Sequence, residues 1–402
     1  MLLGREPEEE LEPAARGLHE DSLSPLARRD GRDRRPSRSR SRDVEAGIGC
    51  SAVKTRVDSP ARHQTSDGRT VYAVCTEVFP NFFGNQYVID DGNGLVLVDT
   101  GSARPASHQN LARALESIGE TFGVAVRLDE VRAILITHGH MDHFGGLGFV
   151  RSHTPAPVGI HPLDRRVLTH YEERVVQTAH ALRRFLLRAG LSAASSDELM
   201  TMYEFPKRMH RSTTVEFALE EGRPVLVPTG STGAGERDLG IEVLHVPGHC
   251  PGQVCLRLGD LLLSADHVLA RITPHQSPES VTLHTGLWHY LESLRKVESL
   301  PGVRLALGGH EKPIEDLEAR VAAIRTSHQK RLDKVLRVCA EPTTVADVSR
   351  RLFGPLKGYD VLLGLEETGA HVEYLEQIGR LGIANLDEVQ RSEDAAPLYE
   401  AR

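Results

Sequence analysis

The chain has 402 residues, of which 40% are hydrophobic and 26% are charged, and its formal net charge is −8. This length allows a large core and more than one domain, whereas the acidic balance argues against a general affinity for nucleic acid or anionic membranes. No apolar run reaches the length of a membrane span. The 5 cysteines lack zinc-knuckle or redox-pair spacing, so we expect packing roles in a reducing cytoplasm. Cys250 is the one to follow, because it comes directly after His249.

The first part of the chain, residues 1–66, is rich in Arg, Ser and Glu and has no apolar periodicity, which predicts a disordered tail. An Arg-Ser run at residues 34–42 could contact RNA or be phosphorylated. A solvated tail, or a start codon assigned too far upstream, is the simpler interpretation. The N-terminus also lacks the apolar core of a secretory signal and is too acidic for a transit peptide.

Strand and helix patterns alternate between residues 67 and 314, which predicts an α/β layered domain. Asp91-Gly92-Asn93-Gly94 is a strong hairpin-turn signal between two of the strands. We expect strands at residues 71–74, 85–89, 95–98, 131–136, 241–246, 254–258, 261–264 and 303–307, and helices at residues 108–118 and 288–298.

Residues 163–214 interrupt this pattern with helical spacing and predict a helical insertion between two halves of the sheet structure. One helix is expected at residues 171–189, and a second begins near Ser196. The insertion could cover a site as a lid or could simply pack against the domain, and the sequence leaves both interpretations open.

The last part of the chain, residues 315–402, predicts a small helical or winged-helix-like domain. We expect helices at residues 315–339, from a Thr343-Thr344 cap to about 352, and at 366–381. Winged helices often bind nucleic acid, but this region carries many acidic residues, so packing or homodimer formation is at least as well supported. Nucleic acid is therefore an open but not a favoured partner.

The most informative motif is Thr137-His138-Gly139-His140-Met141-Asp142-His143, which follows an apolar strand. Imidazole and carboxylate groups suit a borderline or hard divalent ion, and four of them this close together suggest more than one ion. His138 and His140 alternate on an extended segment, and Asp142 and His143 follow where the chain turns toward a helix. The two pairs can therefore face two adjacent ions.

Three further candidate ligands lie later in the chain, each after an expected strand. They are His249 in Pro247-Gly248-His249-Cys250-Pro251-Gly252, Asp266 in Ser264-Ala265-Asp266-His267, and His310 in Gly308-Gly309-His310-Glu311. Each alone could be a hydrogen-bonded loop residue. Together, in this order after the first motif, they indicate a metal site at the ends of the strands.

This ordered set, with Val98-Asp99-Thr100-Gly101, resembles the metallo-β-lactamase superfamily, whose hallmark is His-x-His-x-Asp-His; the resemblance covers about residues 70–313. It implies a four-layer αββα sandwich with the site at one edge. It also implies that His138, His140 and His249 hold one ion, that Asp142, His143 and His310 hold a second, and that Asp266 bridges both. Asp99 would orient a ligating histidine.

The resemblance further implies a metal-dependent hydrolase that uses a metal-bridging hydroxide, with Asp142 as the catalytic residue that orients it. Two zinc ions are the expected cofactors, and iron or manganese also suit nitrogen and oxygen ligands. Asp266 stands where some true β-lactamases carry Cys, which favours the glyoxalase II-like or lactonase-like branches. The C-terminal helices resemble, less specifically, those of hydrolases related to β-lactamase-like protein 2, some of which cleave single-stranded RNA and others acyl thioesters.

Among possible small-molecule substrates, a thioester or lactone is favoured, because the insertion is apolar and the chain is acidic. The alternatives are an endoribonuclease or phosphodiesterase, which would need a basic, aromatic-lined groove, a mononuclear-iron sulfur dioxygenase of the same fold, and a non-catalytic metal-binding protein. Weaker candidates for substrate contact are His275, Trp288, His289 and Tyr290.

Overall fold

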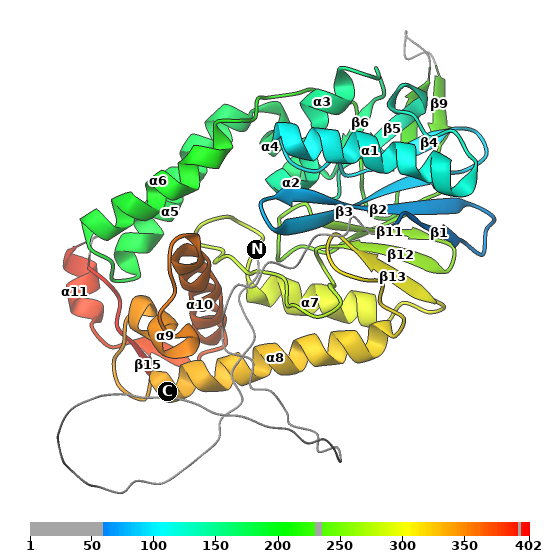
Figure 1. Ribbon diagram of the computed structural model, residues 1–402. Coiled ribbons are helices and arrows are strands. Elements are labelled where there is room, and N and C mark those ends of the chain that lie inside the picture. Colours follow the sequence, from blue (N-terminus) through cyan, green and yellow to red (C-terminus); the bar gives the residue numbers. More distant parts are fainter. Residues whose placement is uncertain (1–58, 230–234, 393–394) are drawn as a thin grey trace, which may run out of the picture. The chain divides into compact units, whose positions relative to one another are not determined.

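Two β-sheets pack face to face, and helices cover the outer face of each (Figure 1). The computed structural model describes residues 59–229, 235–392 and 395–402. This arrangement confirms the predicted four-layer αββα sandwich. Within the described ranges, no helix is both long enough and apolar enough to cross a membrane.

The first sheet has seven strands in sequence order, antiparallel from β1 to β4 and parallel from β4 to β7. The predicted turn at Asp91-Gly92-Asn93-Gly94 joins β3 to β4, where Asp90 pairs with Leu95. The strands are β1 (Ala61–Gln64), β2 (Thr70–Phe79), β3 (Phe82–Asp90), β4 (Leu95–Val98), β5 (Val131–Leu135), β6 (Val158–Ile160) and β7 (Phe217–Ala218).

The second sheet has four strands in the order β10-β11-β12-β13. Because β11 is antiparallel to both neighbours and β12 is parallel to β13, strands β10, β12 and β13 all run in one direction. The strands are β10 (Glu242–His245), β11 (Val254–Leu258), β12 (Leu261–Ala265) and β13 (Leu305–Gly308); β8 (Leu226–Thr229) and β9 (Gly235–Asp238) form a separate ladder.

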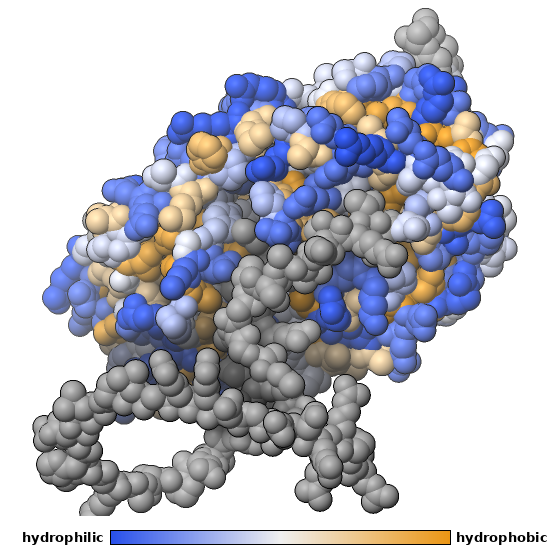
Figure 2. Space-filling model, viewed as in Figure 1, coloured by the Kyte–Doolittle hydropathy of each residue, from blue (hydrophilic) through white to orange (hydrophobic). Residues whose placement is uncertain are grey.

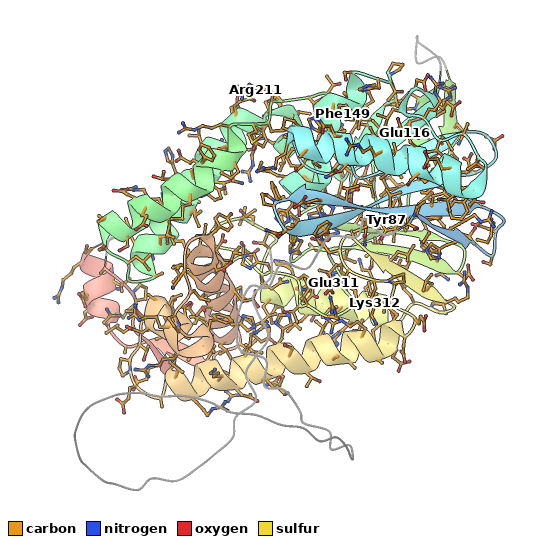
Figure 3. The ribbon with its side chains drawn as sticks, in the orientation of Figure 1. Tyr87, Glu116, Phe149, Arg211, Glu311 and Lys312 are labelled. Atoms are coloured by element: carbon orange, nitrogen blue, oxygen red, sulfur yellow. The ribbon has the colours of Figure 1, made fainter. Side chains whose placement is uncertain are left out.

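The sandwich is stabilised by apolar residues that alternate between its layers. In β4, Val96 and Val98 pack toward the second sheet, whereas Leu95 and Leu97 pack toward the first helical layer. A strand covered on both faces reads as a continuous apolar run, which is why this one was predictable. Tyr87 of β3 lies between the sheets (Figure 3), and its hydroxyl donates a hydrogen bond to Gly308 O at the end of β13 (2.5 Å).

The helices of the outer layers each pack against the sandwich through one buried face. α1 covers the first sheet with α2, α3 and α4, and α7 and α8 cover the second (Figure 1). Their bounds are α1 (Pro105–Phe122), α2 (Met141–Phe144), α3 (Leu147–Arg151), α4 (Pro162–Thr169), α7 (Leu287–Glu298) and α8 (Leu317–Val338).

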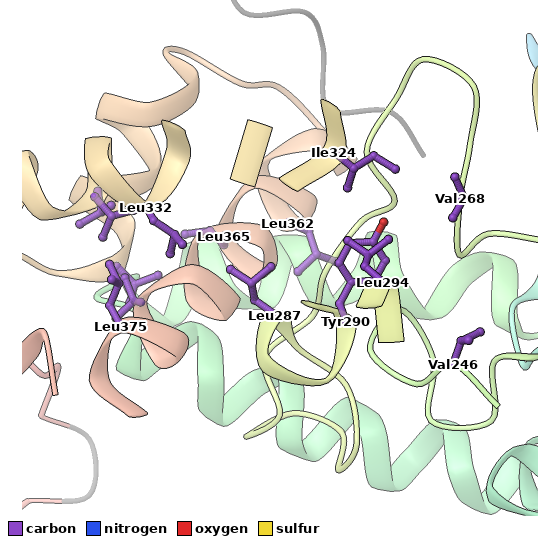
Figure 4. Close-up of a cluster of buried hydrophobic side chains, with 14 of the residues drawn as sticks. Val246, Val268, Leu287, Tyr290, Leu294, Ile324, Leu332, Leu362, Leu365 and Leu375 are labelled. Atoms are coloured by element: carbon purple, nitrogen blue, oxygen red, sulfur yellow. The ribbon is translucent and has the colours of Figure 1, made fainter. Parts of the chain in front are cut away.

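The helical insertion and the C-terminal helices lie together beside the sandwich (Figure 1). Their apolar faces share one core with α7 and α8, part of which is drawn in Figure 4 with Leu294 of α7, Ile324 of α8 and Leu365 of α10. The core therefore continues across residue 315, and the division into domains there stays a prediction. The helices are α5 (Tyr171–Arg188), α6 (Ala193–Lys207), α9 (Val345–Phe353), α10 (Tyr359–Gln377) and α11 (Leu386–Arg391).

The C-terminal helices end in a small β-ladder, in which β14 (Leu381–Ile383) pairs antiparallel with β15 (Tyr399–Ala401). The Thr344 hydroxyl caps α9 by accepting a hydrogen bond from Asp347 N, as the sequence predicted. α10 begins seven residues earlier than expected, since its buried face extends back to Leu362 and Leu363. The winged-helix-like description of this region stays a prediction.

The outer surface of the insertion mixes hydrophobic with hydrophilic residues (Figure 2). Val176 of α5 is 54% exposed and Phe205 of α6 is 74% exposed. Some apolar side chains of the insertion are thus exposed.

The predicted tail boundary at residue 66 is wrong. β1 lies inside the expected tail and pairs with β2, with Ala61 opposite Ala73. A four-residue, mostly exposed edge strand carries no apolar periodicity, so nothing in its sequence marked it as ordered. The rest of the tail prediction, residues 1–58, lies outside the described residues.

Candidate metal centre

The candidate ligands meet at one edge of the sandwich because they follow strands that run in the same direction within each sheet. Asp99 follows β4, and the motif from His138 to His143 follows β5. His249, Asp266 and His310 follow β10, β12 and β13. The carboxyl ends of parallel strands lie at the same sheet edge, so five loops converge there.

Asp266 lies at the centre of the group. Its Oδ2 is 3.3 Å from His310 Nε2, 3.5 Å from His143 Nε2 and 3.7 Å from His249 Nε2. Asp142 Oδ2 lies 3.5 Å from the same His310 nitrogen. One carboxylate facing three ring nitrogens is the position that the resemblance implies for a bridging group.

Hydrogen bonds donated by Nδ1 orient three of the histidines. His143 Nδ1 donates to Asp99 Oδ2 (2.7 Å), His249 Nδ1 to the carbonyl of His275 (2.7 Å), and His310 Nδ1 to the carbonyl of Phe83 (2.6 Å). An Nδ1–H that donates in this way directs Nε2 toward the centre, where it can bind an ion once it carries no proton.

Asp99 is itself held in place by Thr137. Its Oδ1 accepts a hydrogen bond from Thr137 N (2.9 Å) and its Oδ2 one from the Thr137 hydroxyl (2.8 Å). This is the arrangement expected for the residue predicted to orient a ligating histidine.

The other side of the centre is formed by His138 and His140, with His138 Nε2 3.1 Å from His140 Nδ1. The Cys250 sulfur lies within 4.8 Å of a ring nitrogen on each. The cysteine singled out in the sequence is therefore buried beside the candidate ligands, and burial raises the pKa of its thiol well above the usual value.

The centre concentrates negative charge. Asp99, Asp142 and Asp266 have only histidines as ion-pair partners, and no arginine or lysine of the described ranges pairs with them. Burial lowers the pKa of His310, but the Asp266 and Asp142 carboxylates outweigh this and raise it to about 9. These buried carboxylates raise the proton affinity of the histidines that face them, and bound metal ions would supply positive charge in place of those protons.

His138, His140 and His249 are held neutral. In His143, burial lowers the pKa, but the Asp266 and Asp99 carboxylates outweigh this and raise it well above the usual value. Burial lowers the pKa of His249 to about 4, and burial with the neighbouring His143 lowers the pKa of His138 well below its usual value. Neutral imidazole is the form that binds a metal.

The donor atoms fit metal ions. In the described part of the chain, four buried atoms of the centre have no hydrogen-bond partner: His143 Nε2, His249 Nε2, His310 Nε2 and Asp266 Oδ1. Each such atom costs free energy unless something binds it. The backbone also approaches closely, since a Cβ at Gly309 would lie 2.2 Å from Asp266 Oδ1 and 2.7 Å from His143 Cε1.

Three residues that flank the centre adopt the left-handed backbone conformation, which is unfavourable for residues other than glycine: Asp99 (φ 59°), Ala265 (φ 45°) and Glu311 (φ 66°). Such strain concentrates at functional sites, where the surrounding structure holds it in place.

Asp164 was missed in the sequence, although it joins two of the ligand loops. This carboxylate is completely buried and accepts hydrogen bonds from Gly139 N (2.8 Å) and Gly252 N (2.9 Å). Burial raises its pKa to about 6. Asp164 follows β6, the parallel neighbour of β5, so the rule that located the other residues would have found it had that strand been predicted.

A cavity of about 520 Å³ opens onto the centre. His140, Asp142, His249, Cys250 and Asp266 form one part of its wall. Most of the remainder is apolar and comes from the β2–β3 turn, α4, α5, α6 and α10, including Phe79, Phe82, Val167, Val175 and Leu363. The helical insertion thus both packs against the domain and walls the cavity.

Of the four weaker candidates for substrate contact, only His275 lines this cavity. Tyr290 was predicted wrongly, because it is completely buried and its hydroxyl donates to His267 O (2.9 Å). Trp288 packs against Tyr374 on the outside of α7, and His289 pairs with Glu279 (3.0 Å), so these two expectations are also corrected.

Comparisons with known proteins agree with this geometry. The family model described as the metallo-β-lactamase superfamily matches residues 80–310. The chain is 25% identical over 295 residues to the probable metallo-hydrolase YqjP of Bacillus subtilis (strain 168), which covers 71% of this chain and 85% of that protein. It is 22% identical over 281 residues to the lactamase-like protein vrtG of Penicillium aethiopicum, covering 67% of this chain and 68% of that protein.

Solved structures show the same fold. A metallo-β-lactamase family protein from Thermus thermophilus superposes with a TM-score of 0.64 at 25% identity, covering 83% of this chain and 98% of that chain. A β-lactamase domain protein from Burkholderia ambifaria superposes with a TM-score of 0.64 at 22% identity, covering 87% of this chain and 97% of that chain. Both alignments extend well beyond the segment that the family model matches.

Proposed function

The chain belongs to the metallo-β-lactamase superfamily, and from this premise we propose that it is a metal-dependent hydrolase of thioester or lactone carbonyls. One observation carries the proposal: buried donor atoms without partners converge at the wall of a largely apolar cavity. The name of the Bacillus subtilis relative, a probable metallo-hydrolase, supports the hydrolytic assignment.

The residues divide into two sets around Asp266. His138, His140 and His249 would hold one divalent ion, and Asp142, His143 and His310 a second; zinc is expected, with iron and manganese as alternatives. When bound, such ions acidify a water molecule and polarise the oxygen of the bond to be cleaved.

Asp142 has the position and ionisation state of a group that orients the attacking water. Its carboxylate lines the cavity. Burial raises its pKa, but His143 and His310 outweigh this and hold the pKa well below its usual value. The carboxylate is therefore ionised at neutral pH, so its Oδ atoms accept a hydrogen bond from water and direct the oxygen lone pair toward the substrate.

The cavity supports an acyl substrate over a polynucleotide. Its aromatic and aliphatic side chains suit an acyl chain and keep bulk water from the reacting carbonyl. A nuclease would need a groove with several cations to neutralise phosphates. The residues that line this cavity include one lysine, Lys207, and one arginine, Arg174.

The test is metal analysis of the purified protein, combined with a panel of thioesters, lactones and single-stranded RNA assayed before and after chelation. We expect two metal ions per chain and ester hydrolysis that is lost on chelation and restored by the ion. Metal-dependent RNA cleavage without ester hydrolysis would favour the nuclease instead. A single iron with oxygen consumption on a thiol substrate would favour the dioxygenase.

A further inference from the structure

Lys207 places a cation in the wall of the substrate cavity. It is the last residue of α6, and the hydroxyl of Tyr171 on α5 fixes its backbone by donating to Lys207 O (2.9 Å). The ammonium lies 4.3 Å from the centre of the Tyr203 ring, close enough for a cation–π contact. The charged group is thus held at a defined place.

This cation lacks a counter-ion. Within the part of the chain that the structure describes, Lys207 forms no ion pair and its ammonium donates no hydrogen bond. Burial lowers the pKa of Lys207 to about 8, although the nearby Glu366 raises it, so the group is still mostly charged at neutral pH. A partly desolvated ammonium without a partner is costly, and a ligand anion would offset that cost.

The carboxylate that acts on Lys207, Glu366, is already engaged with other partners. Glu366 of α10 accepts a hydrogen bond from the Ser277 hydroxyl (3.0 Å) and lies 3.4 Å from His275 Nε2. It therefore influences Lys207 without pairing with it.

Arg174 of α5 is a second unpaired cation in the same wall. Its side-chain hydrogen bond is a long one, from Nη1 to Gln177 Oε1 (3.4 Å), and no carboxylate of the described residues pairs with it. Arg151, by contrast, contacts Glu216 at 2.6 Å. Two cations without a carboxylate partner among the described residues thus lie in a mostly apolar wall.

From this arrangement, and resting on the hydrolytic function proposed above, we propose that the cavity selects substrates that carry an anionic group, a carboxylate or a phosphate, which Lys207 and Arg174 bind while the ester carbonyl lies at the metal centre. Lysine and arginine are the side chains that recognise such groups, and their role here is specificity, not bond cleavage.

The test compares thioesters with and without an anionic group. The probes are the pentanoyl and glutaryl thioesters of N-acetylcysteamine, which differ by a terminal carboxylate, and pentanoyl-coenzyme A, which adds phosphates on the leaving group. The measured quantity is the ratio of kcat/KM for each charged probe to kcat/KM for the neutral one. The wild type is expected to prefer the glutaryl probe if the anion is a carboxylate, and the coenzyme A probe if it is a phosphate.

In Lys207→Met and in Arg174→Gln, the kcat/KM ratio for the preferred charged probe should fall about tenfold, which corresponds to the loss of one charged contact. Lys207→Arg should retain most of it. Lys330→Met, which changes an exposed lysine of α8, is the matched control and should leave the ratio unchanged. Two variants at separate positions keep the test valid if one of them fails to fold.

The outcomes separate this inference from the function on which it rests. Hydrolysis of the neutral probe with no preference for either charged probe, or with a preference that both variants retain, would overturn the anion site and leave the hydrolase intact. No metal-dependent hydrolysis of any probe would overturn both.

Discussion

Two buried clusters of histidine and carboxylate occur in the described part of this molecule, and one of the two has the character of a metal centre. The first is the group at the strand ends around Asp266. The second lies between α8 and α10, where His328, Glu367 and His371 also bring donor atoms within 4.8 Å of one another. Both are deeply buried, so residue type and burial do not separate them.

The difference lies in what satisfies the donor atoms. In the helical cluster, Glu367 pairs with Arg331 (2.9 Å) and accepts a hydrogen bond from Gln276 N (2.8 Å). His371 Nδ1 donates to the carbonyl of Glu367 (2.7 Å), so its Nε2 can accept from His328 Nδ1 (3.1 Å).

In the helical cluster, the charge of Glu367 is therefore balanced by Arg331, and most of the polar side-chain atoms have hydrogen-bond partners. His328 Nε2 has none. At the strand ends, several donors converge without partners and no lysine or arginine of the described residues pairs with the carboxylates. A metal site is thus better recognised by converging donor atoms without partners than by ligand-type residues alone.

The largest expected effect is the loss of a proposed ligand. His140→Ala or His249→Ala should lower metal affinity by more than about 100-fold, beyond the range seen for residues that only orient ligands, and should abolish hydrolysis while the fold is retained. Metal content, turnover and circular dichroism measure these effects. The matched variant in the helical cluster, His371→Ala, should keep the full metal content, and a loss of metal there would remove the distinction between the two clusters.

The helical cluster should respond through stability instead. Arg331→Met leaves Glu367 buried without its cation, which should lower the free energy of unfolding by about 3–5 kcal/mol. Arg325→Met, on the same helix, breaks a partly exposed pair with Glu298 (3.3 Å) and should cost less than about 1 kcal/mol. Chemical denaturation measures both. Equal losses in the free energy of unfolding would show that the Arg331–Glu367 pair stabilises the fold no more than a partly exposed ion pair does.

Asp164 tests how the strand-end cluster is held together. Because its carboxylate joins the loops at Gly139 and Gly252, Asp164→Ala should lower metal affinity by about 10–100-fold, the range for groups that position ligands. The exposed Asp129→Ala, which breaks a surface contact with Arg127, should leave affinity unchanged. Affinity is measured by competition with a chelator, and a wild-type value in Asp164→Ala would mean that the loops keep their geometry without this link.

The contrast also explains what the sequence could predict. The motif from His138 to His143 is local, and the later candidates each follow a strand of four or five residues that was expected from the sequence, so their convergence required only that the strand ends meet. Asp164 follows β6, a strand of three residues, which is too short to show a pattern. Lys207 reaches the cavity only because α6 folds back along α5, a tertiary fact with no local signal.

The incorrect predictions have an equally simple cause. Trp288, His289 and Tyr290 are consecutive in α7, and consecutive helical residues point about 100° apart because a turn takes 3.6 residues. They could not all face one cavity. Tyr290 points into the core and Trp288 outward, as the helical period requires.

The smallest expected effect concerns a segment outside both clusters. Removal of residues 1–58 should leave metal content and hydrolysis within about twofold of the full chain, since no residue proposed for either cluster lies there; a shift this small corresponds to well under 1.4 kcal/mol. Removal of residues 1–66 also deletes β1 and the Ser66 N–H bond to Asp260 (2.9 Å). That deletion should lower the free energy of unfolding by about 1–3 kcal/mol while turnover per folded molecule is kept. Thermal melts and initial rates on both truncations measure this, and a large drop in rate for the shorter deletion would mean that the N-terminal segment takes part in the centre after all.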